Sequence, residues 1–176
     1  RGPRFYSATR MNERYLRWWT PYLSRDFEML VFGQGGGLPL ILYPTSFGNF
    51  RQCKDFHLTD ACAEFVDSGR VTLYCPDAID LDSFYNKSIH PADRIKTHMA
   101  YENVILHDVI DFARREAGCH RVAVTGSSLG PYHAANLAFR HPAPVTHPLR
   151  LRRALRIRDF SGGHHTETTH CTTPHP

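Results

Sequence analysis

Short apolar runs alternate along this chain with longer stretches in which apolar residues recur every three or four positions. Four runs rich in aliphatic and aromatic residues predict buried β-strands, at residues 27–32, 38–43, 71–75 and 121–125. Three stretches with helical spacing predict α-helices, at residues 50–68, 94–117 and 131–138. Such alternation predicts an α/β fold, with a mostly parallel sheet, helices on both faces and the functional site at the carboxyl ends of the strands.

A glycine-rich segment at residues 33–37 separates the first two predicted strands. Glycine runs between two apolar runs are typical of tight turns, so we expect residues 27–32 and 38–43 to form a hairpin. A phosphate-binding loop must open a helix whose amides face the phosphate. This segment opens a strand, so the sequence does not indicate a nucleotide site.

Composition describes one ordinary globular domain, with 41% hydrophobic and 22% charged residues in a chain of 176. No apolar run reaches the roughly 18 residues of a membrane span, and no signal-peptide pattern opens the chain, so we expect a cytoplasmic protein. Met11 opens the first patterned segment, and residues 1–10 are expected to be a flexible lead.

Charge and cysteine spacing narrow the function classes further. The net charge is +4, but its excess lies beyond His141, so the body of the chain is not a basic surface and no nucleic-acid partner is expected. The five cysteines are odd in number and far apart, with no C-x-x-C pair. We therefore expect free thiols in a reducing compartment, with no cofactor.

The motif Gly126-Ser127-Ser128-Leu129-Gly130 carries the strongest functional signal in the sequence. It follows a predicted strand and precedes a predicted helix, which is the setting of the G-x-S-x-G nucleophile elbow. The two glycines permit a sharp turn and close packing, and the helix N-terminus favours a developing oxyanion. The sequence therefore predicts Ser128 as a catalytic nucleophile; an ordinary glycine-rich connection is the alternative.

Backbone amides beside this serine are the candidates for an oxyanion hole. The Leu129 amide is the natural first donor, because it belongs to the residue after the nucleophile. A second donor comes in such sites from the loop after the third strand, which places the amides of Ser46 and Phe47 as candidates. A plain strand-to-helix turn is the alternative for this loop.

Five segments together resemble the esterase-D-like branch of the α/β-hydrolase superfamily: residues 15–21, 44–48, 82–86, 90–91 and 124–136. The resemblance covers residues from about 11 to 141 and implies hydrolysis of a small-molecule carboxylic ester through an acyl-serine at Ser128. It also implies that Trp18 and Tyr85 border the substrate cleft. Pro131 stands where a small residue is expected, a departure that the first helical turn tolerates.

The end of the chain departs from this pattern. In this fold the triad acid and base follow the serine on later loops, but only 48 residues follow Ser128. Residues 149–158 alternate apolar residues with arginine, which does not suit a strand buried on both faces. We expect the fold to be incomplete on its C-terminal side, with a core at 11–141 and an altered strand plus polar His/Thr-rich tail at 142–176.

Two alternatives to an active esterase follow from that departure. One is an inactive hydrolase remnant, truncated or damaged in its reading frame, that lacks the triad acid and base. The other is an interaction module that uses its arginine-rich segment on anionic partners. A sheet cut after the elbow helix also leaves an edge exposed, through which we expect oligomers.

No histidine stands out as the base. His133 is expected to face helix packing, whereas His90 and His98 are candidates from the segment before the elbow strand, and further candidates lie in the tail (His164, His165, His170). The aspartates at 77, 80 and 82 lack the spacing of a calcium loop and are expected to cap and solvate a loop. The histidine-rich tail offers metal ligands without a fixed geometry, so no metal site is expected.

Overall fold

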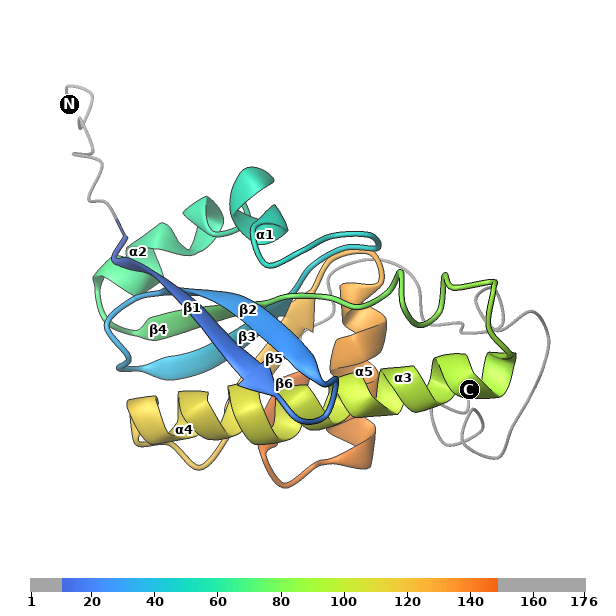
Figure 1. Cartoon of the computed structure of the whole chain (residues 1–176). Coiled ribbons are helices and arrows are strands. Elements are labelled where there is room, and N and C mark those ends of the chain that lie inside the picture. Colours follow the sequence, from blue (N-terminus) through green and yellow to red (C-terminus); the bar gives the residue numbers. More distant parts are fainter. Residues whose placement is uncertain (1–10, 149–176) are drawn as a thin grey trace.

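The computed structural model describes residues 11–148, and these form one mixed sheet packed between helices (Figure 1). The six strands of the described residues are β1 (Glu13–Thr20), β2 (Arg25–Phe32), β3 (Leu38–Tyr43), β4 (Val71–Pro76), β5 (Val122–Gly126) and β6 (Val145–Pro148). Their order across the sheet is β1-β2-β4-β3-β5-β6. The pairs β1–β2 and β2–β4 are antiparallel, and the other three pairs are parallel. The predicted α/β class is confirmed.

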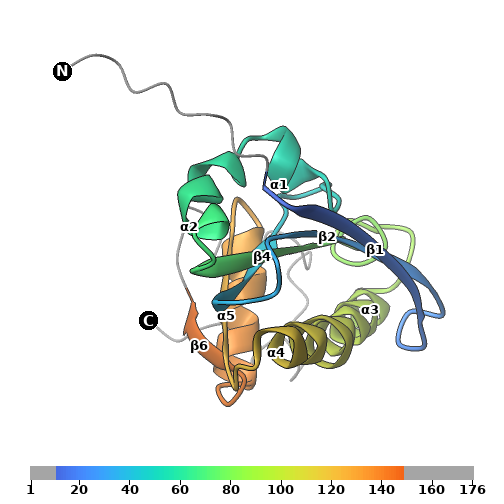
Figure 2. The ribbon, with the colours of Figure 1, turned by 90° about the vertical axis from the view of Figure 1, so that its left-hand side faces the viewer.

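Helices cover both faces of the sheet. The helical segments are α1 (Gln52–Asp55), η1 (Asp60–Cys62), α2 (Ala63–Asp67), α3 (Pro91–Asn103), η2 (Val104–Ile110), α4 (Asp111–Ala117) and α5 (Gly130–Arg140). Figures 1 and 2 show α1 and α2 on one face and α3, α4 and α5 on the other. One buried apolar cluster lies between β4 and the α1–α2 side, and a larger one lies between the sheet and the long helix.

The expected hairpin between residues 27–32 and 38–43 is wrong. β2 pairs with β1 on one side and with β4 on the other, and β4 separates it from β3. Three glycines in the connecting segment have positive φ, and the amide of Leu38 donates to the carbonyl of Arg70 beyond β4. The glycine segment therefore crosses the position in the sheet that β4, a later part of the sequence, occupies between β2 and β3. A local turn rule cannot predict this crossing.

The hairpin lies one element earlier, between β1 and β2, where Trp18 is paired with Phe27 and Thr20 with Arg25. β1 was not predicted as a strand. It lies at the edge of the sheet, and polar and aromatic residues alternate along it, with Tyr15 and Trp19 half or more exposed. An edge strand with so little buried surface gives a weak apolar signal.

The two long helical predictions had different outcomes. The single helix expected at 50–68 is wrong, because the segment breaks into short turns whose aromatic residues Phe56 and Phe65 face solvent. The helix expected at 94–117 is confirmed as one helical segment from Pro91 to Ala117, with a π-helical stretch at its centre. It ends at Gly118, whose φ of 61° is the left-handed cap conformation.

The cysteines among the described residues are free thiols, as expected: Cys53 and Cys75 are buried, and Cys62 and Cys119 are partly exposed. Burial raises the pKa of Cys62, which keeps this thiol protonated at neutral pH. Within residues 11–148, no helix has the length and apolar character that a membrane crossing requires.

Candidate active site

Ser128 lies in a strained turn between a buried strand and a buried helix. All five residues of β5 are buried, α5 begins at Gly130, and Ser128 between them is exposed with a φ of 58°. A left-handed conformation costs a non-glycine residue about 1–2 kcal/mol, so the neighbouring structure must hold it in place. The strand, turn and helix predicted around the G-x-S-x-G motif are therefore present.

The two glycines of the motif permit the close approach that makes this turn. A Cβ on Gly126 would lie 2.7 Å from the Cα of Gly130, inside any normal contact distance. A Cβ on Gly130 would lie 3.1 Å from the carbonyl oxygen of Tyr43. The first turn of α5 thus packs directly on the ends of β5 and β3, with room for neither side chain.

The loop after β3 begins level with the elbow. β3 and β5 are parallel neighbours, and Tyr43 is paired with Gly126. The amides of Ser46, Phe47 and Leu129 lie outside helices and strands, and none of them donates a hydrogen bond within the described part of the chain. Three amide donors without an acceptor among the described residues therefore follow the carboxyl ends of two adjacent strands, and an oxyanion hole is built from backbone donors of this kind.

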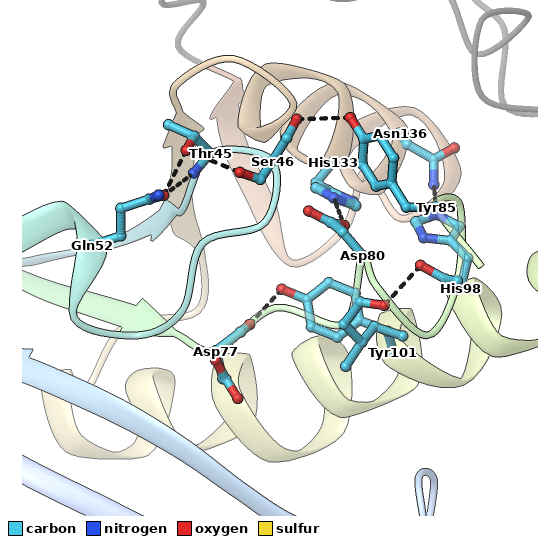
Figure 3. A network of polar contacts seen from close by, with 12 residues as sticks. Thr45, Ser46, Gln52, Asp77, Asp80, Tyr85, His98, Tyr101, His133 and Asn136 are labelled. Carbon is cyan, nitrogen blue, oxygen red and sulfur yellow. Dashed lines mark hydrogen bonds and ion pairs between the residues drawn. The ribbon is translucent and has the colours of Figure 1, made fainter. Parts of the chain in front are cut away.

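Side chains from two other segments hold this loop. Oε1 of Gln52 accepts from the amide of Thr45 at 2.6 Å and from its hydroxyl at 2.7 Å. The hydroxyl of Tyr85 donates to Oγ of Ser46 at 3.0 Å (Figure 3). The Tyr85 ring also lies 4.1 Å from that of Phe47, centroid to centroid. The loop is thus fixed on both sides, with Phe47 itself exposed and at a φ of 61°.

The two residues that the resemblance placed at the cleft lie far apart. Tyr85 contacts the loop that carries Ser46 and Phe47. Trp18 lies on β1, and three strands (β2, β4 and β3) separate β1 from β5. Its indole Nε1 donates to Oδ2 of Asp108 at 3.1 Å. The structure brings Tyr85, Ser46 and Phe47 together but does not join Trp18 to them.

The described histidines that were considered as a base have other partners. Nε2 of His133 lies 3.3 Å from Oδ1 of Asp80, with both side chains buried, so His133 faces helix packing as expected. His98 is buried 3.3 Å from the Asn136 amide, and Nδ1 of His90 accepts the Ala92 amide as the N-cap of α3. Ser128 has no side-chain hydrogen bond among residues 11–148. His164, His165 and His170 lie outside the described residues.

A buried polar cluster behind the elbow was missed by the sequence analysis. Asn136 on α5 donates to Oε2 of Glu102 on α3 at 2.7 Å, and Oε1 of Glu102 lies 2.8 Å from Nε2 of His141 (Figure 3 shows Asn136 and His98 side by side). Burial lowers the pKa of His98 well below its ordinary value, and electrostatic interaction with the neighbouring His133 and Arg140 lowers it further. The sequence contained one signal of this cluster: His133 and Asn136 are polar residues three positions apart on the otherwise mostly apolar helix α5.

Of the three aspartates after β4, Asp80 is buried, Asp77 is partly buried and Asp82 is exposed. Asp80 is buried beside His133, so the expected loop role is wrong for Asp80. Asp77 accepts the Phe50 amide at 3.3 Å, and burial raises the pKa of its carboxyl; Asp82 pairs with Arg25. Within residues 11–148, no group of three or more His, Cys, Asp or Glu side chains is arranged to hold a metal ion.

The sequence matches no family model and no curated protein. Many solved structures are similar to it in fold, among them the following three. An S-formylglutathione hydrolase from Staphylococcus aureus has a TM-score of 0.59 and 16% identity, over 78% of this chain and 55% of the other. A CE1 ferulic acid esterase from Anaeromyces mucronatus has a TM-score of 0.57 and 11% identity, over 77% and 55% of the two chains.

The third is a fluorophosphonate-binding serine hydrolase from Staphylococcus aureus, with a TM-score of 0.58 and 16% identity, over 77% of this chain and 54% of the other. The chain thus spans about half the length of the structures that it matches. At these identities the likeness concerns the backbone, and it agrees with the strand order and the elbow described above. The described residues therefore have the α/β-hydrolase fold, of the form seen in S-formylglutathione hydrolases and ferulic acid esterases.

Proposed function

We propose that this chain carries the nucleophile half of a serine hydrolase of the esterase type, with Ser128 as the nucleophile. The observation that carries the proposal is the exposed side chain of Ser128 at positive φ between β5 and α5. Among the described residues Ser24 is also exposed at positive φ, but it lies in the turn of the β1–β2 hairpin, which accounts for its backbone conformation. Ser128 lies instead between a buried strand and a buried helix, the setting in which an attacking hydroxyl projects from the backbone.

In the proposed reaction Oγ of Ser128 attacks the ester carbonyl and gives its proton to a base. The tetrahedral intermediate expels the alcohol, which takes up that proton, and water then releases the acid from the acyl-serine. The amides of Leu129 and Phe47, with Ser46 as the alternative donor, stabilise the oxyanion. Their lack of other acceptors supports this role, and the chemistry needs no cofactor.

The proposed substrate is a small-molecule ester. Two similar structures are named as a formylglutathione hydrolase and a ferulic acid esterase, which supports this class without choosing its acyl or alcohol part. Phe47 is 58% exposed and rests on Tyr85, so an apolar group on the substrate has a surface to contact beside Ser128. Free thiols support a reducing compartment, and we propose the cytoplasm.

The base and its acid partner are assigned to no described residue. This observation favours a second candidate, a noncatalytic hydrolase remnant that keeps the elbow and the loop but not the triad. The two candidates differ in rate, because a missing triad base lowers turnover by several powers of ten.

Labelling with a fluorophosphonate probe tests the nucleophile. We expect peptide mapping of the labelled chain to find the adduct on Ser128, because this hydroxyl is the exposed one in the elbow. Ser128→Ala should abolish the label, and Ser127→Ala, one residue away, should retain it. An adduct on Ser127 or Ser46, or undiminished labelling of Ser128→Ala, would refute the assignment.

Hydrolysis of short-chain aryl esters separates the two candidates. A rate at least a hundredfold above that of Ser128→Ala establishes an active esterase. A rate equal to that of the variant, together with no probe adduct, establishes the remnant.

A further inference from the structure

A cavity lies beneath the β1–β2 hairpin, on the face of the sheet that α3, α4 and α5 cover. Its volume is about 340 Å³, which is within the range of small-molecule sites. It opens between β1 and the long helix formed by α3, η2 and α4, which Figure 2 shows passing under the hairpin. Because β2, β4 and β3 separate β1 from β5, the cavity is distinct from the elbow.

The cavity exists because the helix supports the hairpin at two points. Both supports come from the π-helical segment η2, a kind of turn that is frequent at functional sites. Asp108 accepts the indole N–H of Trp18 at 3.1 Å, and the ring of His107 stacks on that of Tyr22 at 5.6 Å. These contacts fix the orientation of the Trp18 ring, so one wall of the cavity is rigid.

The interior of the cavity is apolar. Met29, which is 1% exposed, contributes from β2, and Leu16 and Trp18 contribute from β1. Phe112 closes the side formed by α4, and its ring meets that of Tyr74 edge to face. An apolar group of the size of a phenyl ring has continuous contact with these side chains.

The rim is positively charged. Arg17 and Arg115 line it, against Asp108 as the one carboxylate among the lining residues. Arg17 is bound to Asp26 at 2.6 Å, whereas Arg115 is exposed and has no hydrogen-bond or ion-pair partner within residues 11–148. Its guanidinium is therefore available to a carboxylate, which it can bind through two parallel N–H groups.

We propose that this cavity binds a small amphipathic carboxylate, with its apolar part against the partly exposed Trp18 and Phe112 and its carboxylate at Arg115. The site is independent of Ser128 and of the proposed hydrolase chemistry. Charge at the rim supplies the preference for an anion, and the apolar interior supplies the contact area.

Tryptophan fluorescence gives a direct test, because Trp18 and Trp19 are the two tryptophans of the chain. In a Trp19→Phe background, Trp18 reports alone. We expect titration with phenylacetate to change its emission saturably, with an affinity at least tenfold above that for phenylacetamide, which has the same shape without the charge. Arg115→Gln should remove the tenfold preference, and Arg121→Gln, an exposed arginine outside the cavity, should keep it.

Equal affinity for the acid and the amide, an unchanged preference in Arg115→Gln, or no saturable change with phenylacetate would each overturn the proposal. Ser128→Ala should leave the titration unchanged. A loss of binding in that variant would instead mean that phenylacetate occupies the elbow, so failure of this proposal and failure of the proposed function give different results.

Discussion

Ser128 is exposed to solvent and its backbone has a strained, left-handed conformation. This strain has a measurable consequence for the free energy of unfolding. Ser128→Gly and Ser128→Ala both remove the hydroxyl, but only glycine adopts a φ of 58° without steric cost. After the entropy that glycine loses on folding, we expect the free energy of unfolding of Ser128→Gly to exceed that of Ser128→Ala by about 0.5–1 kcal/mol. Urea denaturation of the two variants measures the difference.

Ser127 provides the matched control, because it precedes Ser128 in the same turn and its φ is not positive. There the order should reverse, with Ser127→Ala more stable than Ser127→Gly. If the glycine variant is less stable than the alanine variant at both positions, Ser128 is not held in the left-handed conformation. The argument for a projecting nucleophile then loses its basis.

Helices α3 and α5 are joined behind the elbow by buried polar side chains rather than by apolar contacts alone. His98 stays neutral in the folded state because burial, and then the electrostatic influence of the neighbouring His133 and Arg140, lower its pKa. In the unfolded chain the same histidine takes up a proton below about pH 6.5. The unfolded state then binds more protons than the folded state, so the free energy of unfolding falls as the pH falls below that value.

His98→Gln keeps a polar side chain but cannot titrate. Between pH 7 and pH 5 we expect the wild-type chain to lose about 1–2 kcal/mol more of its free energy of unfolding than this variant. His120→Gln, at an exposed position before β5, should follow the wild-type curve. The test compares how steeply the free energy of unfolding changes with pH, so a variant that is less stable at every pH still gives a clear result. Parallel curves for wild type and His98→Gln would show that His98 is not kept neutral.

Elements with strong local patterns were predicted well from the sequence. β4 and β5 are continuous apolar runs, and the segment from Pro91 to Ala117 has an apolar face and a glycine cap. The elbow was also predictable, since two glycines at fixed spacing are required by backbone contacts that involve only the next element and β3. Local chemistry and the final structure agree at these positions.

The remaining features depend on parts of the chain that are distant in sequence. β2 and β3 are adjacent along the chain, but β4 inserts between them, and no turn rule contains that information. Tyr85 was placed at the cleft by resemblance alone; its hydrogen bond to Ser46 joins residues 39 positions apart. The buried pair of Asn136 and Glu102 is separated by 34 positions, so neither residue alone suggests its partner.

At the scale of the whole molecule, the two edges of the sheet differ in their protection. β1 carries charged residues that are tied to neighbouring segments: Arg14 binds Glu116 at 2.5 Å, and Glu13 binds Lys54 at 2.5 Å. Charges on an edge strand oppose pairing with another chain. Within residues 11–148, β6 is the opposite edge, a short strand whose one described partner is β5.

We therefore expect the chain to self-associate through β6 and not through β1, because within residues 11–148 no strand pairs with the outer edge of β6. Light scattering should show oligomers that grow with protein concentration, and a dye that binds exposed apolar surface should fluoresce. Hydrogen exchange at low and high concentration locates the contact: amides at 145–148 should gain protection, and those at 13–20 should not. A monodisperse monomer with a sharp thermal transition would contradict this expectation, and it would mean that the β6 edge is covered within the chain itself.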